Sequence, residues 1–179
     1  LVWLQLRVAE GHPIPFGQQD VNGYGSAIEC RIYAEDADAG FLPATGTLAA
    51  RVGREQEGLR VDAGVEAGDE ISVHYDPMIA KVIAWGEDRE TARRRMIDAL
   101  RRMSLAGITT NRAFLIRVLE HREFAAGDID THFIERNGDA LLAGVSDDAV
   151  LRAAALVAVV GHERRRATRN ILPAMEPGF

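Results

Sequence analysis

The chain has 179 residues, 47% of them hydrophobic, and a formal net charge of −6. Its length suits one ordinary domain with attached pieces, and its hydrophobic content is enough for a buried core. The negative charge argues against a nucleic-acid partner, because phosphate binding requires a basic surface. No stretch approaches the roughly 20 apolar residues of a membrane helix. The single cysteine, Cys30, leaves no internal disulfide and is typical of a reducing compartment.

Residues 1–10 have apolar side chains at helical spacing and predict a helix, which Gly11 and Pro13 end. Neither an initiator Met nor an N-cap residue precedes this helix, and no signal or transit segment is visible. We therefore expect the helix to continue from a longer chain. Residues 11–24 are rich in Gly, Pro and polar residues and predict a linker.

Strands are predicted next. In Ala27–Tyr33 the apolar Ile28, Cys30 and Ile32 share one face, because side chains alternate along a strand. Glu29 and Arg31 then lie on the other face, toward solvent or a site. Further strands are predicted at 47–52, at 60–65 and 70–75 (paired around a turn at 66–69), and at 78–85, a nearly continuous apolar run typical of a central strand.

Helices follow the strands. Asp88 and Asn111 are predicted N-caps of two helices. The apolar positions of these helices are Ala92, Met96, Leu100 and Met103 in the first and Phe114, Leu115, Val118 and Leu119 in the second. Ser146 is predicted to begin a third helix that ends at about Val160, before the basic residues 164–166. Strands followed by helices indicate an α+β fold.

Motifs for several kinds of chemistry are missing from the sequence. It contains no Walker-type phosphate loop, no Gly-x-Ser-x-Gly elbow and no Cys or His pair at metal spacing. The five histidines are scattered, so we predict no metal site. The arginines at 93–95, 101 and 102 share a helix with an apolar stripe, which indicates a solvated helix face and not an RNA-binding surface.

Two segments carry a family resemblance. The first is Ser26-Ala-Ile-Glu-Cys-Arg-Ile-Tyr-Ala-Glu-Asp36 with Phe41-Leu-Pro-Ala-Thr-Gly46, and the second is Val73-His-Tyr-Asp-Pro-Met-Ile-Ala-Lys81. Both resemble the C-terminal domain of biotin carboxylases. Further matches come in the family's order at 85–89, 107–111 and 127–134, and residues 1–11 resemble the stretch after the ATP-grasp centre. The resemblance covers about residues 1–136; Ser26 departs from it, since a His is common at that position.

Within the family, residues 65–81 look most like the biotin-bearing subunit of 3-methylcrotonyl-CoA carboxylases. The resemblance implies a small antiparallel β-sheet domain with flanking helices, as a fragment of an ATP-grasp enzyme. It implies three parts: the end of the ATP-grasp region with a linker (1–23), the biotin carboxylase C-terminal domain (24–136) and a helical connection toward a carboxyltransferase-binding domain (137–179).

The resemblance also implies a ligase activity, in which ATP and bicarbonate carboxylate biotin and the carboxylate then passes to an acyl-CoA. The implied cofactors are biotin, ATP and Mg, with the ATP and Mg ligands upstream of Leu1 and the biotinyl lysine downstream of Phe179. The implied partners are a carboxyltransferase (beta) subunit and a biotin carrier domain in a large hetero-oligomer. The expected location is the cytoplasm, or the mitochondrial matrix in a eukaryote. The fragment alone is expected to be inactive.

Arg31 is the catalytic residue that the resemblance implies, near bicarbonate and the ureido ring of biotin. A permanently charged, forked guanidinium stabilises negative charge on the ureido oxygen without titrating. The alternative is an exposed strand arginine paired with Glu29 on the same face. Asp76 either holds the guanidinium of Arg31 at the substrate site or is a turn residue before Pro77. Thr131 is expected at the edge of the nucleotide pocket.

Lys81 invites comparison with a biotinylated lysine, but it lies in an apolar strand run and not on a hairpin tip, so we interpret it as structural. Two rival functions stay open from the sequence. One is a non-catalytic β-rich module that binds a partner and uses Arg31 in a surface ion pair. The other is the same carboxylase unit in a pyruvate or urea carboxylase.

Overall fold

The computed structural model describes residues 1–52 and 55–142. The chain divides into two units, residues 1–141 and 142–179, and the first is the one described below. Helix α1 (Val2–Ala9) has no buried side chain, and it ends at Glu10 before Gly11, whose φ is +89°. The predicted opening helix and its glycine stop are thus confirmed. The predicted linker contains one 3-10 turn, η1 (Gln18–Asp20).

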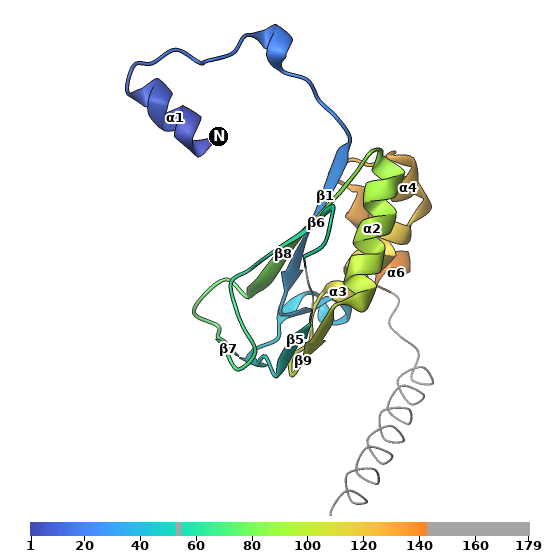
Figure 1. The fold of residues 1–179 in the computed structure, drawn as a ribbon. Helices are drawn as coiled ribbons and strands as arrows, with labels where there is room; N and C mark the ends of the chain where they lie inside the picture. Colours follow the sequence, from blue (N-terminus) through green and yellow to red (C-terminus); the bar gives the residue numbers. More distant parts are fainter. Residues whose placement is uncertain (53–54, 143–179) are drawn as a thin grey trace, which may run out of the picture. The chain divides into compact units, whose positions relative to one another are not determined.

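A three-stranded antiparallel sheet in the order β1-β8-β6 forms the centre of this unit (Figure 1). Its strands are β1 (Ser26–Tyr33), β8 (Met78–Gly86) and β6 (Leu59–Ala63). The alternation predicted for β1 is confirmed, since Ile28, Cys30 and Ile32 are buried and Glu29 and Arg31 are exposed. The central place predicted for the apolar run of β8 is confirmed too, because β8 pairs with both neighbours.

Three pairs of short strands form separate two-stranded sheets outside the central sheet. Each pair is antiparallel, and each element has two or three residues: β2 (Glu35–Asp36) with β3 (Leu42–Pro43), β4 (Gly46–Thr47) with β7 (Glu70–Ile71), and β5 (Ala50–Val52) with β9 (Ser104–Ala106). A second 3-10 turn, η2 (Ala37–Ala39), connects β2 to β3.

The predicted pairing of 60–65 with 70–75 is wrong. β6 pairs with β8, and β7 ends at Ile71 and pairs with β4. After Ile71 the backbone turns, because side-chain oxygens take up backbone N–H groups: the Ser72 hydroxyl accepts from His74 and the Asp76 carboxylate accepts from Met78. Such local bonds compete with a strand ladder.

The predicted single strand over 47–52 is also wrong, because the chain changes partner within it. β4 pairs with β7, whereas β5 pairs with β9. Between them lies Leu48, which is fully buried and donates its N–H to the carbonyl of Asp69, while the N–H of Ala49 donates to Ala106. The buried leucine therefore marks the crossing from one partner to the next.

Helix α2 (Arg89–Arg102) covers one face of the central sheet (Figure 1). As predicted, Asp88 caps it, since its carboxylate accepts the Thr91 N–H at 2.7 Å. The predicted apolar stripe of this helix is confirmed as buried. Cys30 lies in this core, and burial raises the pKa of its thiol to about 12. The thiol is therefore uncharged at neutral pH and inert as a nucleophile.

Four short helices follow β9: α3 (Arg112–Glu120), α4 (Arg122–Ala126), α5 (Phe133–Arg136) and α6 (Gly138–Leu141). Arg117 of α3 holds the end of this series, because its Nε donates to the carbonyl of the buried Leu141 at 2.5 Å. The domain boundary placed after residue 136 stays a prediction. The predicted third helix at 146–160 and the basic residues 164–166 lie outside the described residues.

Asn111 occupies the predicted N-cap position of α3, but its side chain does not cap the helix. Helix α3 does begin at Arg112, but the Asn111 side chain makes no hydrogen bond to the first turn of that helix. Its amide contacts the backbone of β1 instead. A contact 78 residues away along the chain thus outcompetes the local cap. The α+β class, with small antiparallel sheets and flanking helices, is confirmed.

Candidate functional site

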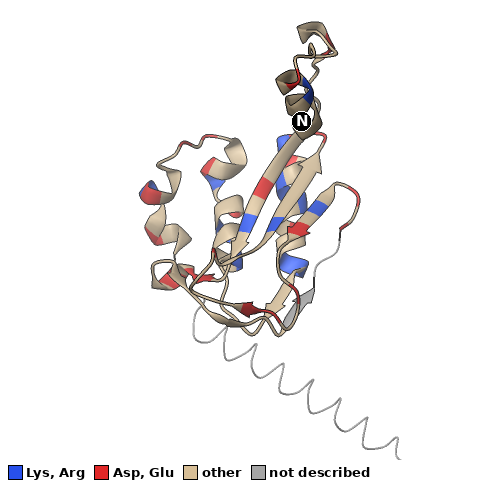
Figure 2. Cartoon of the chain, turned by 90° about the vertical axis from the view of Figure 1, so that its left-hand side faces the viewer, with Lys and Arg blue, Asp and Glu red and all other residues tan. Residues whose placement is uncertain are grey.

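All three strands of the central sheet contain charged residues (Figure 2). Arg31 of β1 lies directly opposite Lys81 of β8, and Lys81 lies opposite Asp62 of β6. Directly paired residues of antiparallel strands project from the same face. Arg31, Lys81 and Asp62 therefore form one row across the sheet, in which two cations are followed by an anion.

Arg31 projects from the middle of β1 and is 60% exposed. Its Nε donates to Glu29 Oε1 at 3.2 Å, and Glu29, together with Tyr33, raises the pKa of Arg31 above its ordinary value. The guanidinium is thus charged at every pH at which the protein is folded. The ion pair with Glu29 that the surface alternative required is present. An ion pair through Nε still leaves the two terminal NH₂ groups of the fork on an exposed side chain, available for an anionic group.

Asp62, at the β6 end of the row, contacts two cations. It accepts from Arg60 Nε at 2.7 Å and lies 3.5 Å from Lys81 Nζ. The hydrogen bond from Arg60 is the largest cause of the lowered pKa of Asp62. Lys81 is therefore tied to a carboxylate on the side away from Arg31. Since like charges directly opposite each other repel, this arrangement reduces the repulsion between the two cations.

The side chain of Lys81 does not lie among the apolar side chains of its strand. Ala80 and Val82 are buried on the α2 face, whereas Lys81 points to the charged face and is 36% exposed. The sequence prediction placed Lys81 in the correct strand but missed its position opposite Arg31. Strand alternation within 78–86 could have revealed that Lys81 projects away from the buried face, but not that it lies opposite Arg31.

Asp76 lies in the turn before β8, and its Oδ1 accepts the Met78 N–H at 3.0 Å. Within the described residues, no hydrogen bond or ion pair joins Asp76 to Arg31. Asp76 lies near Glu35, whose pKa is raised first by burial and second by the charge of Asp76. The hydrogen bond to Met78 supports the interpretation of Asp76 as a turn residue, and its role at a substrate site stays a prediction.

Thr131 lies between α4 and α5, with its hydroxyl 3.5 Å from His132 Nδ1. Its loop is fixed by Asp130, which accepts the His132 N–H and pairs with Arg136 at 2.7 Å. None of the hydrogen bonds and ion pairs of the described ranges joins Thr131 to Arg31. The two residues lie in different parts of the unit, and the nucleotide-pocket role of Thr131 stays a prediction.

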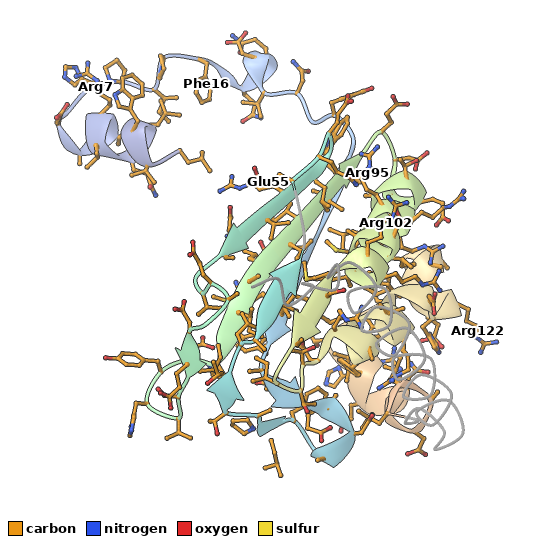
Figure 3. The ribbon with its side chains drawn as sticks, turned by 60° about the horizontal axis from the view of Figure 1, so that its bottom comes forward. Arg7, Phe16, Glu55, Arg95, Arg102 and Arg122 are labelled. Carbon is orange, nitrogen blue, oxygen red and sulfur yellow. The ribbon has the colours of Figure 1, made fainter. Side chains whose placement is uncertain are left out.

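The arginines of α2 form a second charged region. All of them except Arg89 line a groove of about 750 Å³, together with Asp98 and Glu120. Figure 3 shows Arg95 and Arg102 projecting from α2. Arg102 pairs with Asp98 at 2.9 Å, and Arg101 pairs with Glu120. Arg93 departs from the predicted solvated face, since it is only 14% exposed and donates to the Leu119 carbonyl at 2.8 Å.

Two further findings concern the described ranges 1–52 and 55–142. No helix in them is long and apolar enough to cross a membrane. They contain no group of three or more His, Cys, Asp or Glu side chains arranged to hold a metal ion.

Comparison with known proteins gives a consistent result. The model of the biotin carboxylase C-terminal domain matches residues 29–136. The methylcrotonoyl-CoA carboxylase alpha subunit of Arabidopsis thaliana mitochondria is 46% identical over 155 residues, 86% of this chain and 21% of that protein. The human mitochondrial propionyl-CoA carboxylase alpha chain is 44% identical over 140 residues, 75% of this chain and 19% of that protein.

Among solved structures, the biotin carboxylase domain of a thermophilic 2-oxoglutarate carboxylase bound to bicarbonate superposes with a TM-score of 0.71 at 34% identity. The match covers 76% of this chain and 31% of that one. The chain spans about a fifth of the length of the curated relatives it matches.

Proposed function

Because the chain belongs to the family of biotin carboxylase C-terminal domains, we propose that it forms one wall of a biotin carboxylase active site. The enzyme is a biotin-dependent acyl-CoA carboxylase, of the methylcrotonoyl-CoA type. Two relatives named as acyl-CoA carboxylases are 46% and 44% identical to this chain, whereas the 2-oxoglutarate carboxylase domain is 34% identical. The higher identities support an acyl-CoA carboxylase over a carboxylase of 2-oxo acids.

The observation that carries this proposal is the position of Arg31. The residue lies in the family segment, on an exposed sheet face, and its charge is held in place by Glu29. Arg31 stabilises the negative charge that develops on the ureido oxygen of biotin when its nitrogen loses a proton. A guanidinium fixed beforehand by its own strand and carboxylate needs no reorganisation when that charge appears.

Lys81 supports the same role. Its position opposite Arg31 adds a second positive charge to the face that bicarbonate and the ureido group would approach. Two neighbouring cations raise the local concentration of an anionic substrate and favour its bound state. Asp62 orients Lys81 and lowers the net charge of the row, so that the sheet tolerates the pair without a ligand.

The cofactors of this enzyme are biotin, ATP and Mg²⁺. When ATP and Mg²⁺ are bound, they activate bicarbonate. The described residues fit the biotin end of this set, because they offer a fixed, exposed guanidinium. We assign the ATP and Mg²⁺ ligands to an ATP-grasp region that precedes Leu1, and the biotinyl lysine to a domain that follows Phe179. Thr131 lies at the rim of the nucleotide site and Asp76 at the rim of the biotin site.

The proposed partners are a carboxyltransferase (beta) subunit and a biotin carrier domain within a large hetero-oligomer. Residues 1–23 end the ATP-grasp region, residues 24–136 form the C-terminal domain, and residues 137–179 lead toward the carboxyltransferase-binding domain. The proposed location is the cytoplasm, or the mitochondrial matrix in a eukaryote.

Capture on avidin under denaturing conditions, from the source cells, tests the proposal. We expect peptides of this sequence in a biotinylated chain several times its length. A long chain without biotin would instead indicate a carboxylase whose carrier is a separate protein. A free chain of 179 residues without biotin would support the non-catalytic module and remove the catalytic role of Arg31.

A further inference from the structure

Asn111 is the one buried polar side chain among the described residues, with 6% of its surface exposed. It precedes α3 in the chain, but its amide is directed at β1. A buried amide that lacked partners would destabilise the fold, so its bonds decide where it lies.

Three hydrogen bonds connect Asn111 to two residues of β1. Asn111 Oδ1 accepts the Tyr33 N–H at 3.0 Å, and Asn111 Nδ2 donates to the Arg31 carbonyl at 3.2 Å. The backbone N–H of Asn111 donates to the Tyr33 carbonyl at 3.2 Å. The residue thus satisfies three backbone groups on the outer edge of β1, as a neighbouring strand would.

These bonds lie where the pairing of β1 with β8 is irregular. Ile32 pairs with Ala80, but Tyr33 pairs with Met78, so that the register shifts between these two residues. At such a shift the ladder alone does not fix the direction of the strand. Asn111 supplies the missing restraint from the opposite edge, immediately after Arg31.

We propose that Asn111 is a positioning residue for Arg31. Its amide holds the carbonyl of Arg31 while Glu29 holds the guanidinium, and together they fix both ends of the residue. This inference rests on the proposed function, because it assumes that Arg31 acts on substrate.

The amide is required for this role because it uses a donor and an acceptor at once. An aspartate at 111 keeps an acceptor for Tyr33 but turns a carboxylate oxygen toward the Arg31 carbonyl, where the two oxygens repel. The substitution is nearly isosteric, and α3 loses no cap, since the Asn111 side chain makes none. N111D therefore shifts the strand at Arg31 without leaving a cavity.

The experiment uses the full-length carboxylase with ATP, bicarbonate and free biotin. We expect N111D to lower kcat for biotin-dependent ATP cleavage roughly 10- to 100-fold, the range for lost positioning contacts. The KM for ATP should stay unchanged, because the proposed ATP ligands lie in the region before Leu1 and not on the sheet face of Arg31. Should N111D fail to fold, N111S replaces it, since one hydroxyl serves only one of the two amide contacts.

Asn137 provides a matched control. Its Nδ2 also donates to a backbone carbonyl, that of Phe133 at 3.0 Å, but among the described residues it makes no hydrogen bond to β1. N137D should therefore change thermal stability without the selective loss of biotin-dependent turnover.

A double-mutant cycle with R31Q separates positioning from general damage. If Asn111 acts through Arg31, N111D causes no further loss of kcat in the R31Q background. Equal loss in both backgrounds, or normal biotin-dependent turnover of N111D beside impaired R31Q, would overturn the positioning role alone. Normal turnover of R31Q would overturn the proposed function, and the inference with it.

Discussion

The two faces of the central sheet differ in what they contact. The face against α2 is closed by fully buried side chains such as Ile32 and Val82, with Met96 and Leu100 of the helix packed on them. The opposite face carries Arg31 and the other charged residues of its row, and they are partly exposed. Successive residues of one strand thus have different roles. Those on the α2 face stabilise the fold, and those on the charged face are available for chemistry.

The largest stability effect is expected on the α2 face. Ile32 has no exposed surface, so I32A removes buried apolar contacts and leaves a cavity. We expect a loss of about 2–5 kcal/mol in the free energy of unfolding, measured by urea titration. A loss below about 1 kcal/mol would show that α2 collapses onto the sheet and that this face is not closely packed.

Gly86 tests the same face at the point where β8 ends. A Cβ on this residue would lie 2.5 Å from the backbone nitrogen of Ala92 in α2. G86A should therefore force the helix away from the sheet and destabilise the chain by about 1–3 kcal/mol, as overpacking does. The thermal unfolding midpoint reports this change; G64A is a control, because a Cβ there meets nothing within 4 Å.

Substitution on the charged face should leave the fold intact. Arg31 is 60% exposed and its ion pair with Glu29 is solvated, and exposed pairs contribute little to stability. We expect R31Q to unfold at the same urea concentration as the unsubstituted chain. A clear loss of stability would mean that the sheet face is a structural element, and the comparison between the two faces would fail.

The last stability effect depends on pH. Burial and the charge of Asp76 raise the pKa of Glu35 above its ordinary value of 4.5, so the folded state favours the protonated carboxyl. The favourable contribution is complete below pH 4.5 and is lost as the pH rises through the raised pKa. E35Q, which cannot ionise, should gain stability relative to the unsubstituted chain over that window. Parallel unfolding curves at all pH values would contradict the raised pKa.

The sequence predicted the elements whose signal is local. The alternation around Ile32, the apolar run of β8 and the stripe of α2 with its Asp88 cap each depend on neighbouring residues, and all three were correct. The short strands β2, β3 and β9 have two or three residues each, which is too few to show a period, and they were missed. The pairing of β6 with β8 depends on distant residues, so the nearer partner was chosen incorrectly.

The candidate site shows the same limit. Arg31 was found through the family pattern, and strand alternation placed it correctly beside Glu29. The positions of Lys81 and Asn111 depend on register and on a contact between distant segments, which the sequence does not display. The rule that an asparagine before a helix caps that helix predicted the wrong hydrogen-bond partner for the Asn111 side chain. The side chain instead satisfies buried backbone groups at the edge of β1.

The central claim is that Arg31 stabilises charge on biotin, and kinetics of R31Q in the full-length carboxylase test it most directly. The control is R102Q, because Arg102 is also exposed and also paired with a carboxylate, but on α2. We predict that R31Q lowers kcat for biotin-dependent ATP cleavage roughly 100- to 1,000-fold, as loss of an oxyanion donor does, while R102Q retains full activity. Equal activity of the two variants would contradict the account.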